Sequence, residues 1–298
     1  MSQKPAIVIF GDGQAFVLSH GLKRLPEITE KFDVFHMWAV KPHETALAEP
    51  PIPAEVWQRC EAFWMQIGVA PPPPHYAQGA PDRRITFSSL DLPFAFPFYA
   101  ADLVMRPTAR HPMGFGYADR FLVELSETDL TGDAIYLRYE ELQQRHLVVI
   151  DNVLENGTRR MSERDADASV KIAGYALSHT CDQRLAWTRM HPTEAMSAVQ
   201  LDRLLRATFS GQVNRGQKLF GAGARAFAEP HALSAQQDPV SWTVADRLGL
   251  AWWRPDHRYR ISGLNTAMTL RDFVVAYVTE RRRKLAEQGA DGRGVAAA

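Results

Sequence analysis

The feature that most constrains this 298-residue chain is a strand-to-helix transition close to its N-terminus. Ile7–Phe10 is a short, fully apolar run rich in β-branched residues, which is typical of a buried strand in a parallel sheet. The run ends at Gly11–Gln14, and a helical pattern of apolar residues follows until Pro26. Asp33–Val40 is again strand-like. We therefore predict a strand–helix–strand unit with two parallel strands.

Four later segments carry patterns that predict single elements. Ala54–Ile67 has apolar residues on one helical face and is predicted as a helix. Ile85–Tyr99 is aromatic and interrupted by prolines, and we predict a strand followed by a segment that forms the wall of a pocket or core. Tyr136–Asp151 is predicted as helical and then strand-like at Val148–Ile150. Leu185–Thr188 is predicted as another short strand.

The C-terminal third is mainly helical in its pattern. Glu194–Phe209 is predicted as a helix, with Thr193 placed to cap its N-terminus. The stretch 210–239 is rich in Gly, Ala and Gln and is predicted as loop with a short helix. Thr269–Leu285 is predicted as a further helix.

These elements indicate an α/β fold: a small, mainly parallel sheet with a helical majority packed around it, in two lobes. The sheet is expected to carry Ile7–Phe10, Asp33–Val40 and Leu185–Thr188. Residues 1–288 are expected to form a single domain, which such a length allows, and 289–298 a disordered tail.

Charge and cysteine content narrow the class of protein. The 34 Lys and Arg balance 34 Asp and Glu, which argues against a nucleic-acid binder but allows a local basic pocket. Cys60 and Cys181 are too few for a disulfide framework, and no zinc-binding motif occurs, so no metal is expected. No apolar run approaches the ~18 residues of a membrane-spanning helix. We expect a cytoplasmic protein that has no transmembrane segment, and the oligomeric state is left open.

The Gly11–Gln14 turn is the first candidate functional site. Free backbone N–H groups and the helix dipole at a helix N-terminus favour an anion or a developing oxyanion. Glycine permits close approach of a ligand, and Gln14 offers a side-chain donor. The structural alternative is a tight turn in which Asp12 or Gly11 caps the helix. A third glycine is missing, so the turn is not a dinucleotide fingerprint.

His191 and Asp119 are the other candidates. His191 follows a predicted strand and precedes a predicted helix, and an imidazole there can serve as the general base for a sugar hydroxyl. Its structural alternative is capping or packing at a turn. Asp119, with Tyr117 and Arg120, can orient a histidine or bind a sugar hydroxyl, although a loop before a capped helix is the favoured interpretation.

Five short segments, taken in their order and spacing, resemble the WcbI family of polysaccharide-biosynthesis enzymes. They are Phe10–Gln14, Gly116–Arg120, Arg189–Thr193, Asp246–Leu250 and Thr269–Val274. The family is known for binding coenzyme A and is regarded as acetyltransferases that act on capsular sugars. The resemblance therefore implies an acyl donor such as acetyl-CoA, used as a substrate, and a carbohydrate acceptor, with no nucleic-acid partner.

The resemblance also assigns roles to residues. It implies a catalytic set of His191, Gln14 and Asp12. Coenzyme A is expected to contact Gly11, Gly13, Gln14, Arg189, Arg159 and Arg160. The acceptor is expected to contact Tyr117 and Asp119.

One position departs from the family. The family pattern after the first strand is Gly-Asn-Cys-Gln, and this chain has Gly13 where the cysteine stands. Because glycine has no side chain, no acyl-enzyme can form at this position. Three alternatives follow: direct acyl transfer with His191 as base, a coenzyme-A- or nucleotide-binding protein without catalysis, or a Gly-Asp-Ser-like esterase. The esterase is weakened because its serine would also fall on Gly13.

Overall fold

The structure is a computed structural model of the chain, and its backbone divides into two compact units. It describes residues 3–39, 52–72, 84–100, 102, 104–105, 118–210, 219, 221–261 and 266–295. The first unit comprises 1–91, 158–179 and 190–234. The second comprises 92–157, 180–189 and 235–298. The prediction of one domain over 1–288 with a tail over 289–298 stays a prediction.

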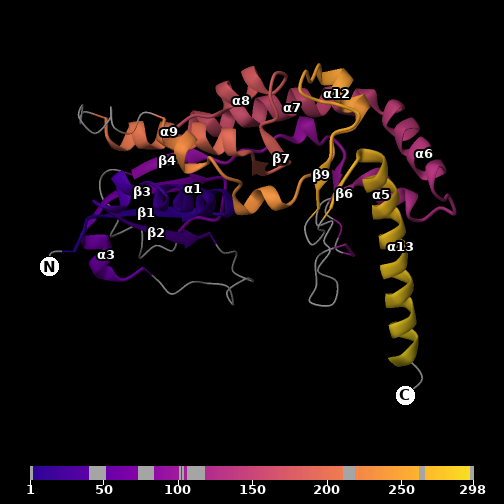
Figure 1. Ribbon diagram of the computed structural model, residues 1–298, viewed down its shortest axis with the longest axis horizontal. Helices are drawn as coiled ribbons and strands as arrows, with labels where there is room; N and C mark the ends of the chain where they lie inside the picture. The colour runs from indigo at the N-terminus through magenta and orange to yellow at the C-terminus, as the bar shows by residue number, and fades with distance from the viewer. Residues whose placement is uncertain are drawn as a thin grey trace. The chain divides into compact units, whose positions relative to one another are not determined.

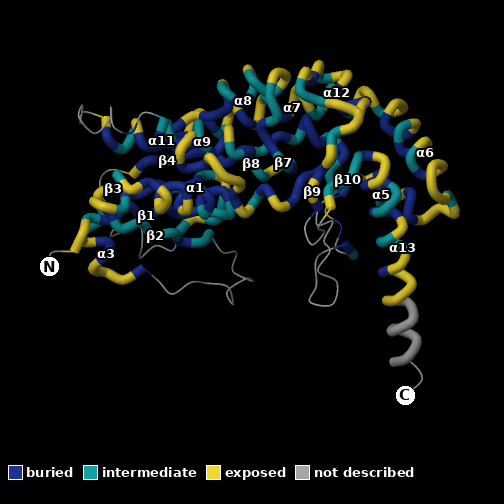
Figure 2. Tube along the Cα trace, in the orientation of Figure 1, coloured by how far each residue is buried: buried dark blue, intermediate teal, exposed yellow. Residues whose placement is uncertain are grey.

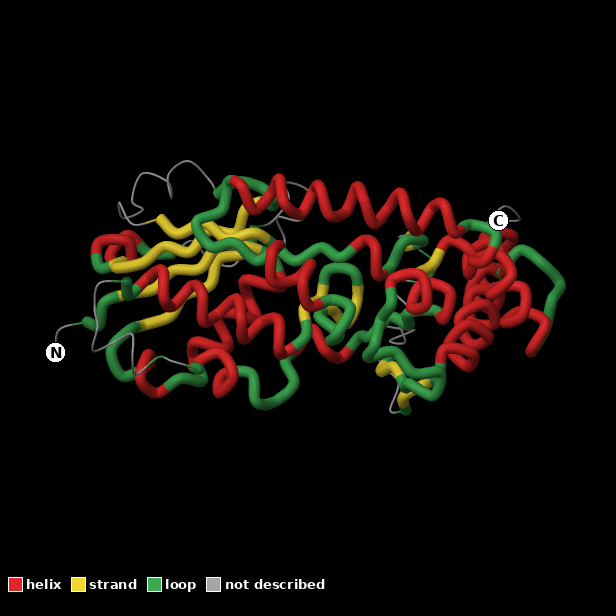
Figure 3. The backbone as a smooth tube through the Cα atoms, turned by 90° about the horizontal axis from the view of Figure 1, so that it is seen from above, coloured by secondary structure: helices red, strands yellow, loops and turns green. Residues whose placement is uncertain are grey.

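The first unit is built on a four-stranded sheet in which all neighbouring strands run parallel (Figures 1 and 3). The strands are β1 (Ala6–Gly11), β2 (Asp33–Trp38), β3 (Cys60–Ile67) and β4 (Arg84–Ser88). Their order is β2-β1-β3-β4. The predicted α/β class with a small parallel sheet is confirmed, as are the strands predicted at Ile7–Phe10 and Asp33–Val40, within two residues at their ends.

β1 is apolar along its whole length because both of its faces are covered (Figure 2). Alternate side chains of a strand point to opposite faces. Ile7 and Ile9 therefore join one hydrophobic cluster, with residues of α1 (Gly13–Lys23) and α9 (Glu194–Thr208). Val8 and Phe10 join another, with residues of α3 (Ala54–Gln58).

The helix predicted over Ala54–Ile67 is wrong beyond its first turns. α3 ends at Gln58, and β3 follows it directly. Phe63 and Trp64 pair with β1 on one side and with β4 on the other, and both are fully buried. An amphipathic helix at a surface buries one face, whereas a central strand buries both. The apolar residues that suggested one helical face are divided between the two sides of the sheet.

Two further strand predictions need correction. Leu185–Thr188 does contain a strand, β7 (Ala186–Thr188), but it belongs to the second unit and is not part of the four-stranded sheet. Val148–Ile150 is helical, because it lies in α7 (Leu147–Ala166). Val148 is 69% exposed and Ile150 is fully buried, which is the division that a helix with one covered face produces.

The predicted cap of α9 is confirmed. The Thr193 hydroxyl accepts a hydrogen bond from the backbone N–H of Met196 at 3.3 Å, directly before the first residue of the helix. The shorter elements of the first unit are α2 (Pro26–Thr29), α8 (Ala173–His179), β8 (His191–Pro192), α11 (Ala222–Ala226) and the 3₁₀ helix η3 (Ala232–Ala235).

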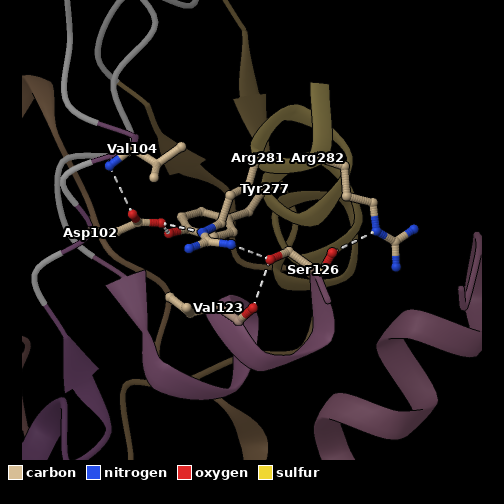
Figure 4. Close-up of polar contacts among 7 residues, drawn as sticks. All are labelled: Asp102, Val104, Val123, Ser126, Tyr277, Arg281 and Arg282. Atoms are coloured by element: carbon tan, nitrogen blue, oxygen red, sulfur yellow. Dashed lines mark hydrogen bonds and ion pairs between the residues drawn. The ribbon is translucent and has the colours of Figure 1, made fainter. Parts of the chain in front are cut away.

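The second unit is mainly helical, and its longest helix, α13, is anchored by a buried ion pair (Figure 4). Arg281 Nε donates to Asp102 Oδ2 at 2.8 Å, and the same oxygen accepts from the Tyr277 hydroxyl. The Arg281 guanidinium also donates to Ser126 Oγ at 2.6 Å.

The other elements of the second unit are short, apart from two helices. They are η2 (Pro93–Ala95), β5 (Tyr99–Ala100), β6 (Ala118–Asp119), α5 (Arg120–Leu125), α6 (Asp133–Gln144), α12 (Trp242–Leu248), β9 (Tyr259–Arg260), β10 (Ala267–Met268) and α13 (Leu270–Val295). Among the described residues, no helix is both long enough and apolar enough to cross a bilayer.

Candidate functional site

The strand order of the first unit marks one edge of its sheet as a ligand site. From β1 the chain continues to β2 on one side, and from β3, the other neighbour of β1, it continues to β4 on the opposite side. The order therefore changes direction between β1 and β3. In open parallel sheets, ligands bind in the crevice outside the carboxyl ends of the strands at such a point. Gly11 ends β1 there, and Gln66 lies next to the end of β3.

Gly11 and Gln66 are in close contact. Gln66 Oε1 accepts a hydrogen bond from the backbone N–H of Asp12 at 2.9 Å. A Cβ added at Gly11 would lie 2.7 Å from Gln66 Cβ and 2.6 Å from Ala15 Cβ, so only glycine fits. Gln66 is 2% exposed, and its Nε2 is buried without an acceptor among the described residues. Such an amide group can donate to a ligand at the end of β1.

Asp12 and Gly13 form the N-terminus of α1. Asp12 is the N-cap, and its Oδ1 accepts a hydrogen bond from the N–H of Gln14 at 2.8 Å. A Cβ at Gly13 would meet Leu233 Cδ2 at 3.4 Å, an ordinary contact distance, so there is room above this residue. The first N–H groups of a helix have no partner inside the helix and carry a partial positive charge.

Gln14 is 3% exposed and its side chain is fully engaged. Its Nε2 donates to the backbone carbonyls of Leu90 at 2.9 Å and Met190 at 2.8 Å, and its Oε1 accepts from the N–H of Leu90 at 2.9 Å. Both amide protons are therefore used within the protein. The side chain joins the start of α1 to the segment after β4 and to the residue before His191.

His191 lies in the same cluster as the turn. The Leu233 backbone carbonyl is hydrogen-bonded to the imidazole, and the Leu233 side chain borders Gly13. Burial lowers the pKa of His191 to about 4, and the charge of His231 lowers it further, against the effect of the Leu233 carbonyl. The imidazole is therefore neutral at pH 7 and can accept a proton.

A second histidine stands beside His191. His231 Nε2 lies 3.2 Å from the Ser197 hydroxyl, and the His231 backbone N–H donates to Glu194 Oε1 at 3.3 Å. Burial lowers the pKa of His231, while the Glu194 carboxylate raises it. His231 Nδ1 is buried without a partner among the described residues.

The predicted arginine ligands lie on α7 or in the second unit. Arg159 and Arg160 are exposed on α7, where Arg159 pairs with Glu163 at 2.8 Å. Arg189 belongs to the second unit, where its guanidinium lies 5.3 Å from the centre of the Tyr99 ring. Their assignment to coenzyme A stays a prediction.

Asp119 also belongs to the second unit, and it is the N-cap of α5. Its Oδ1 accepts from the N–H of Phe121 at 2.8 Å, and its Oδ2 accepts from the Tyr139 hydroxyl at 3.0 Å and from Gln143 Nε2 at 2.9 Å. Burial raises its pKa to about 7, although these hydrogen bonds act in the opposite direction. Tyr117 lies outside the described residues.

Gln66, His231 and Leu233 were not predicted as site residues. The signal for Gln66 was a single amide side chain near the end of a run of aromatic and apolar residues. Because this run was predicted as a helix, the position of Gln66 near the end of a strand was not expected. His231 and Leu233 follow a stretch rich in Gly and Ala without periodicity, so no pattern placed them near the turn.

No protein-family model matches the chain, and no curated protein matches it either. A solved structure of WcbI, described as a novel polysaccharide biosynthesis enzyme, is similar in fold. That structure is of the native protein without a disulfide bond between coenzyme A and one of its cysteines. It aligns with a TM-score of 0.65 and 14% identity, over 94% of this chain and 91% of the other. The likeness shows a shared fold, and membership of the family stays a prediction.

Proposed function

We propose that this protein is a coenzyme-A-dependent acyltransferase that transfers an acetyl or related acyl group to a hydroxyl of a sugar or polysaccharide. The observation that carries the proposal is the cluster at the end of β1, where the strand order changes direction. Gln66 contacts the backbone at Gly11 and Asp12, and Gly13 and His191 both lie next to Leu233. The fold shared with WcbI, whose structure is described together with coenzyme A, supports this choice of acyl donor.

The residues of the cluster fit a thioester group. The N-terminus of α1 and the buried Nε2 of Gln66 offer N–H donors for the carbonyl oxygen as it becomes an oxyanion. The missing side chain at Gly13 leaves space for a group to approach these donors. Asp12 and Gln14 then act as positioning residues, because their side chains hold the turn in place.

His191 supplies the proton transfer. In the proposed step, its neutral imidazole takes the proton of the acceptor hydroxyl while the hydroxyl oxygen bonds to the thioester carbonyl carbon. The carbon–sulfur bond then breaks, and the imidazolium returns the proton to the departing thiolate. The step is direct, since Gly13 offers no nucleophile.

One alternative has a specific observation in its favour. Gly13 stands where the family pattern has its cysteine, so the chain can retain a coenzyme A site and lack turnover. An assay of acyl transfer separates the two functions, because a binding protein binds coenzyme A but transfers no acyl group to any acceptor.

The test combines calorimetric titration of coenzyme A with an acetyl-CoA turnover assay over a panel of sugar acceptors. We expect binding and turnover for the wild-type protein, and at least a hundredfold loss of turnover with retained binding for His191→Gln. His179→Gln, in α8 of the same unit, is the matched control and should keep both. Equal turnover of His191→Gln and the wild type would exclude the mechanism. Binding without turnover would favour the alternative, and absence of binding would exclude both.

A further inference from the structure

The second unit contains a cavity of about 40 Å³ that the proposed acyl transfer does not use. One part of its wall is apolar, with Phe96, Phe98, Leu122, Val244 and Phe273. The other part carries six polar side chains: Tyr99, Asp119, Tyr139, Gln143, Asp238 and Ser241. A water needs roughly 10–15 Å³ of such a cavity, so the space holds about three to four atoms of that size. A whole sugar ring is larger than this.

Three donors of the polar wall are used in hydrogen bonds within the protein. The Ser241 hydroxyl donates to Gln143 Oε1, and Gln143 Nε2 donates to Asp119 Oδ2 at 2.9 Å. The Tyr139 hydroxyl donates to the same Asp119 oxygen at 3.0 Å. The hydroxyl protons of Ser241 and Tyr139 are therefore used. Asp119 Oδ2 already accepts two hydrogen bonds and Oδ1 accepts one from the Phe121 N–H, so Oδ1 keeps one lone pair for a ligand. The cavity is matched to a ligand that donates hydrogen bonds.

Asp238 adds a carboxyl group with unused acceptor capacity. It is 8% exposed, and its Oδ1 accepts from Gln236 Nε2 at 3.1 Å. The nearby Arg184 donates to the backbone carbonyl of Asp238 at 2.8 Å, and its guanidinium lies 5.1 Å from the centre of the Tyr259 ring. Two carboxyl groups thus line a cavity whose described lining contains no Lys, Arg or His.

We propose that this cavity binds a small aliphatic ammonium compound. Its N–H groups donate to Asp119 and Asp238, and its hydrocarbon part contacts the apolar wall. An ammonium group has three donors and no acceptor, which matches a wall of acceptors, and its charge compensates a buried carboxylate. Phe96 and Phe273 add aromatic rings to this wall, and aromatic rings attract a cation. A metal ion fits less well, because the described residues hold no cluster of three or more ligating side chains.

The protonation of the two carboxyl groups gives the site a pH dependence. Burial raises the pKa of Asp119 to about 7, and Arg120, Tyr139 and Tyr277 are the charged or titratable groups that act on it. Burial likewise raises the pKa of Asp238 to about 7, and Arg184 is its charged neighbour. A cation binds the ionised carboxylates better than the neutral acids. Affinity therefore rises with pH through 7, and binding at pH 7 releases protons.

The test is calorimetric titration of the full chain with n-propylammonium chloride, with 1-propanol as the uncharged probe of similar size. We expect the amine to bind at pH 8 at least tenfold more tightly than the alcohol. Asp238→Asn should weaken amine binding at least tenfold. Glu155→Gln, an exposed charge change on α7, should leave it unchanged. Equal affinity for the two probes, no measurable amine binding, or undiminished binding by Asp238→Asn would overturn the proposal.

A titration of the wild type with the amine at several pH values needs no variant. It tests the proposal even if Asp238→Asn fails to fold. Wild-type affinity for the amine should fall at least fivefold from pH 8 to pH 6. At pH 7 the heat of binding should change with the ionisation enthalpy of the buffer, since protons are released. A pH-independent affinity would contradict the proposal. These titrations contain no coenzyme A, so their failure would leave the proposed acyltransferase function unaffected.

Discussion

Gly11 and Gly13 are two residues apart and are glycines for different reasons. Gly11 is enclosed by Gln66 and Ala15, and the contact between this turn and the end of β3 depends on the missing Cβ. A Cβ at Gly13 would instead lie at ordinary contact distance from Leu233. The first glycine is therefore needed for the fold, and the second leaves room that the proposed donor uses.

This difference gives a stability prediction for two alanine variants. Gly11→Ala should lower the free energy of unfolding by about 1–3 kcal/mol, because the new methyl group overpacks a closed contact. Gly13→Ala should change it by less than about 1 kcal/mol, since the contact is ordinary and the unfolded chain loses some freedom. Urea unfolding of the two variants measures both values. Equal losses would contradict the described surroundings of the two residues.

A second residue-level prediction concerns the pH dependence of stability. The folded pKa of His191 is about 4, and an unfolded histidine has a pKa of about 6.5. Between these values the unfolded chain binds a proton that the folded protein does not, so the contribution of neutral His191 to stability is present above pH 6.5 and is lost as the pH falls towards 4.

The measurement is urea unfolding of the wild type and of His191→Gln between pH 7 and pH 4. The wild type should lose more stability over this interval than the variant. His36 and His231, whose pKa values are also lowered, act in the same direction and remain in both proteins. Parallel stability curves for the two proteins would show that the pKa of His191 is not depressed.

At the scale of elements, local patterns predicted some parts of the chain and missed others for a physical reason. β1 and α9 were predictable because a buried apolar run and a capped amphipathic helix carry their own signals. β3 was not, because its apolar residues result from burial on both faces of a sheet. Burial by neighbouring strands is a property of the folded chain, and a local pattern does not show it.

The Gln14 side chain links α1 to the segment after β4 and to the residue before His191, and the contribution of this link to stability can be tested. Gln14→Leu keeps the size of the side chain but leaves the N–H and carbonyl of Leu90 and the carbonyl of Met190 without this partner. Since each buried unsatisfied group costs about 1–3 kcal/mol, the loss of unfolding free energy should be about 3 kcal/mol or more.

The matched control is Gln144→Leu. Gln144 is exposed and makes a single side-chain hydrogen bond, to Thr243 at 3.0 Å, so its removal should cost about 1 kcal/mol. Thermal or urea unfolding of both variants gives the comparison. Similar losses for Gln14→Leu and Gln144→Leu would show that the bridge contributes little.

At the scale of the whole molecule, the candidate site was predictable in part. The Gly11–Gln14 turn and His191 were singled out from their positions at strand-to-helix junctions, and the structure brings them together through Leu233 and Met190. Gln66 and His231 could not be foreseen, because their place in the site depends on strand order and on segments distant in sequence. The predicted arginines stay untested as ligands, since charge alone does not fix where a long side chain binds.

The central claim, that coenzyme A binds at the end of β1, is tested most directly by a thiol placed at Gly13. Gly13→Cys fits the space above the turn, because its Cβ meets Leu233 at contact distance. Treatment with coenzyme A disulfide, followed by intact-mass and peptide analysis, should show one coenzyme A attached at position 13. The wild type, which carries Cys60 and Cys181, is the control for adducts at other thiols. An equal adduct level in the two proteins, or no adduct at position 13, would contradict the claim.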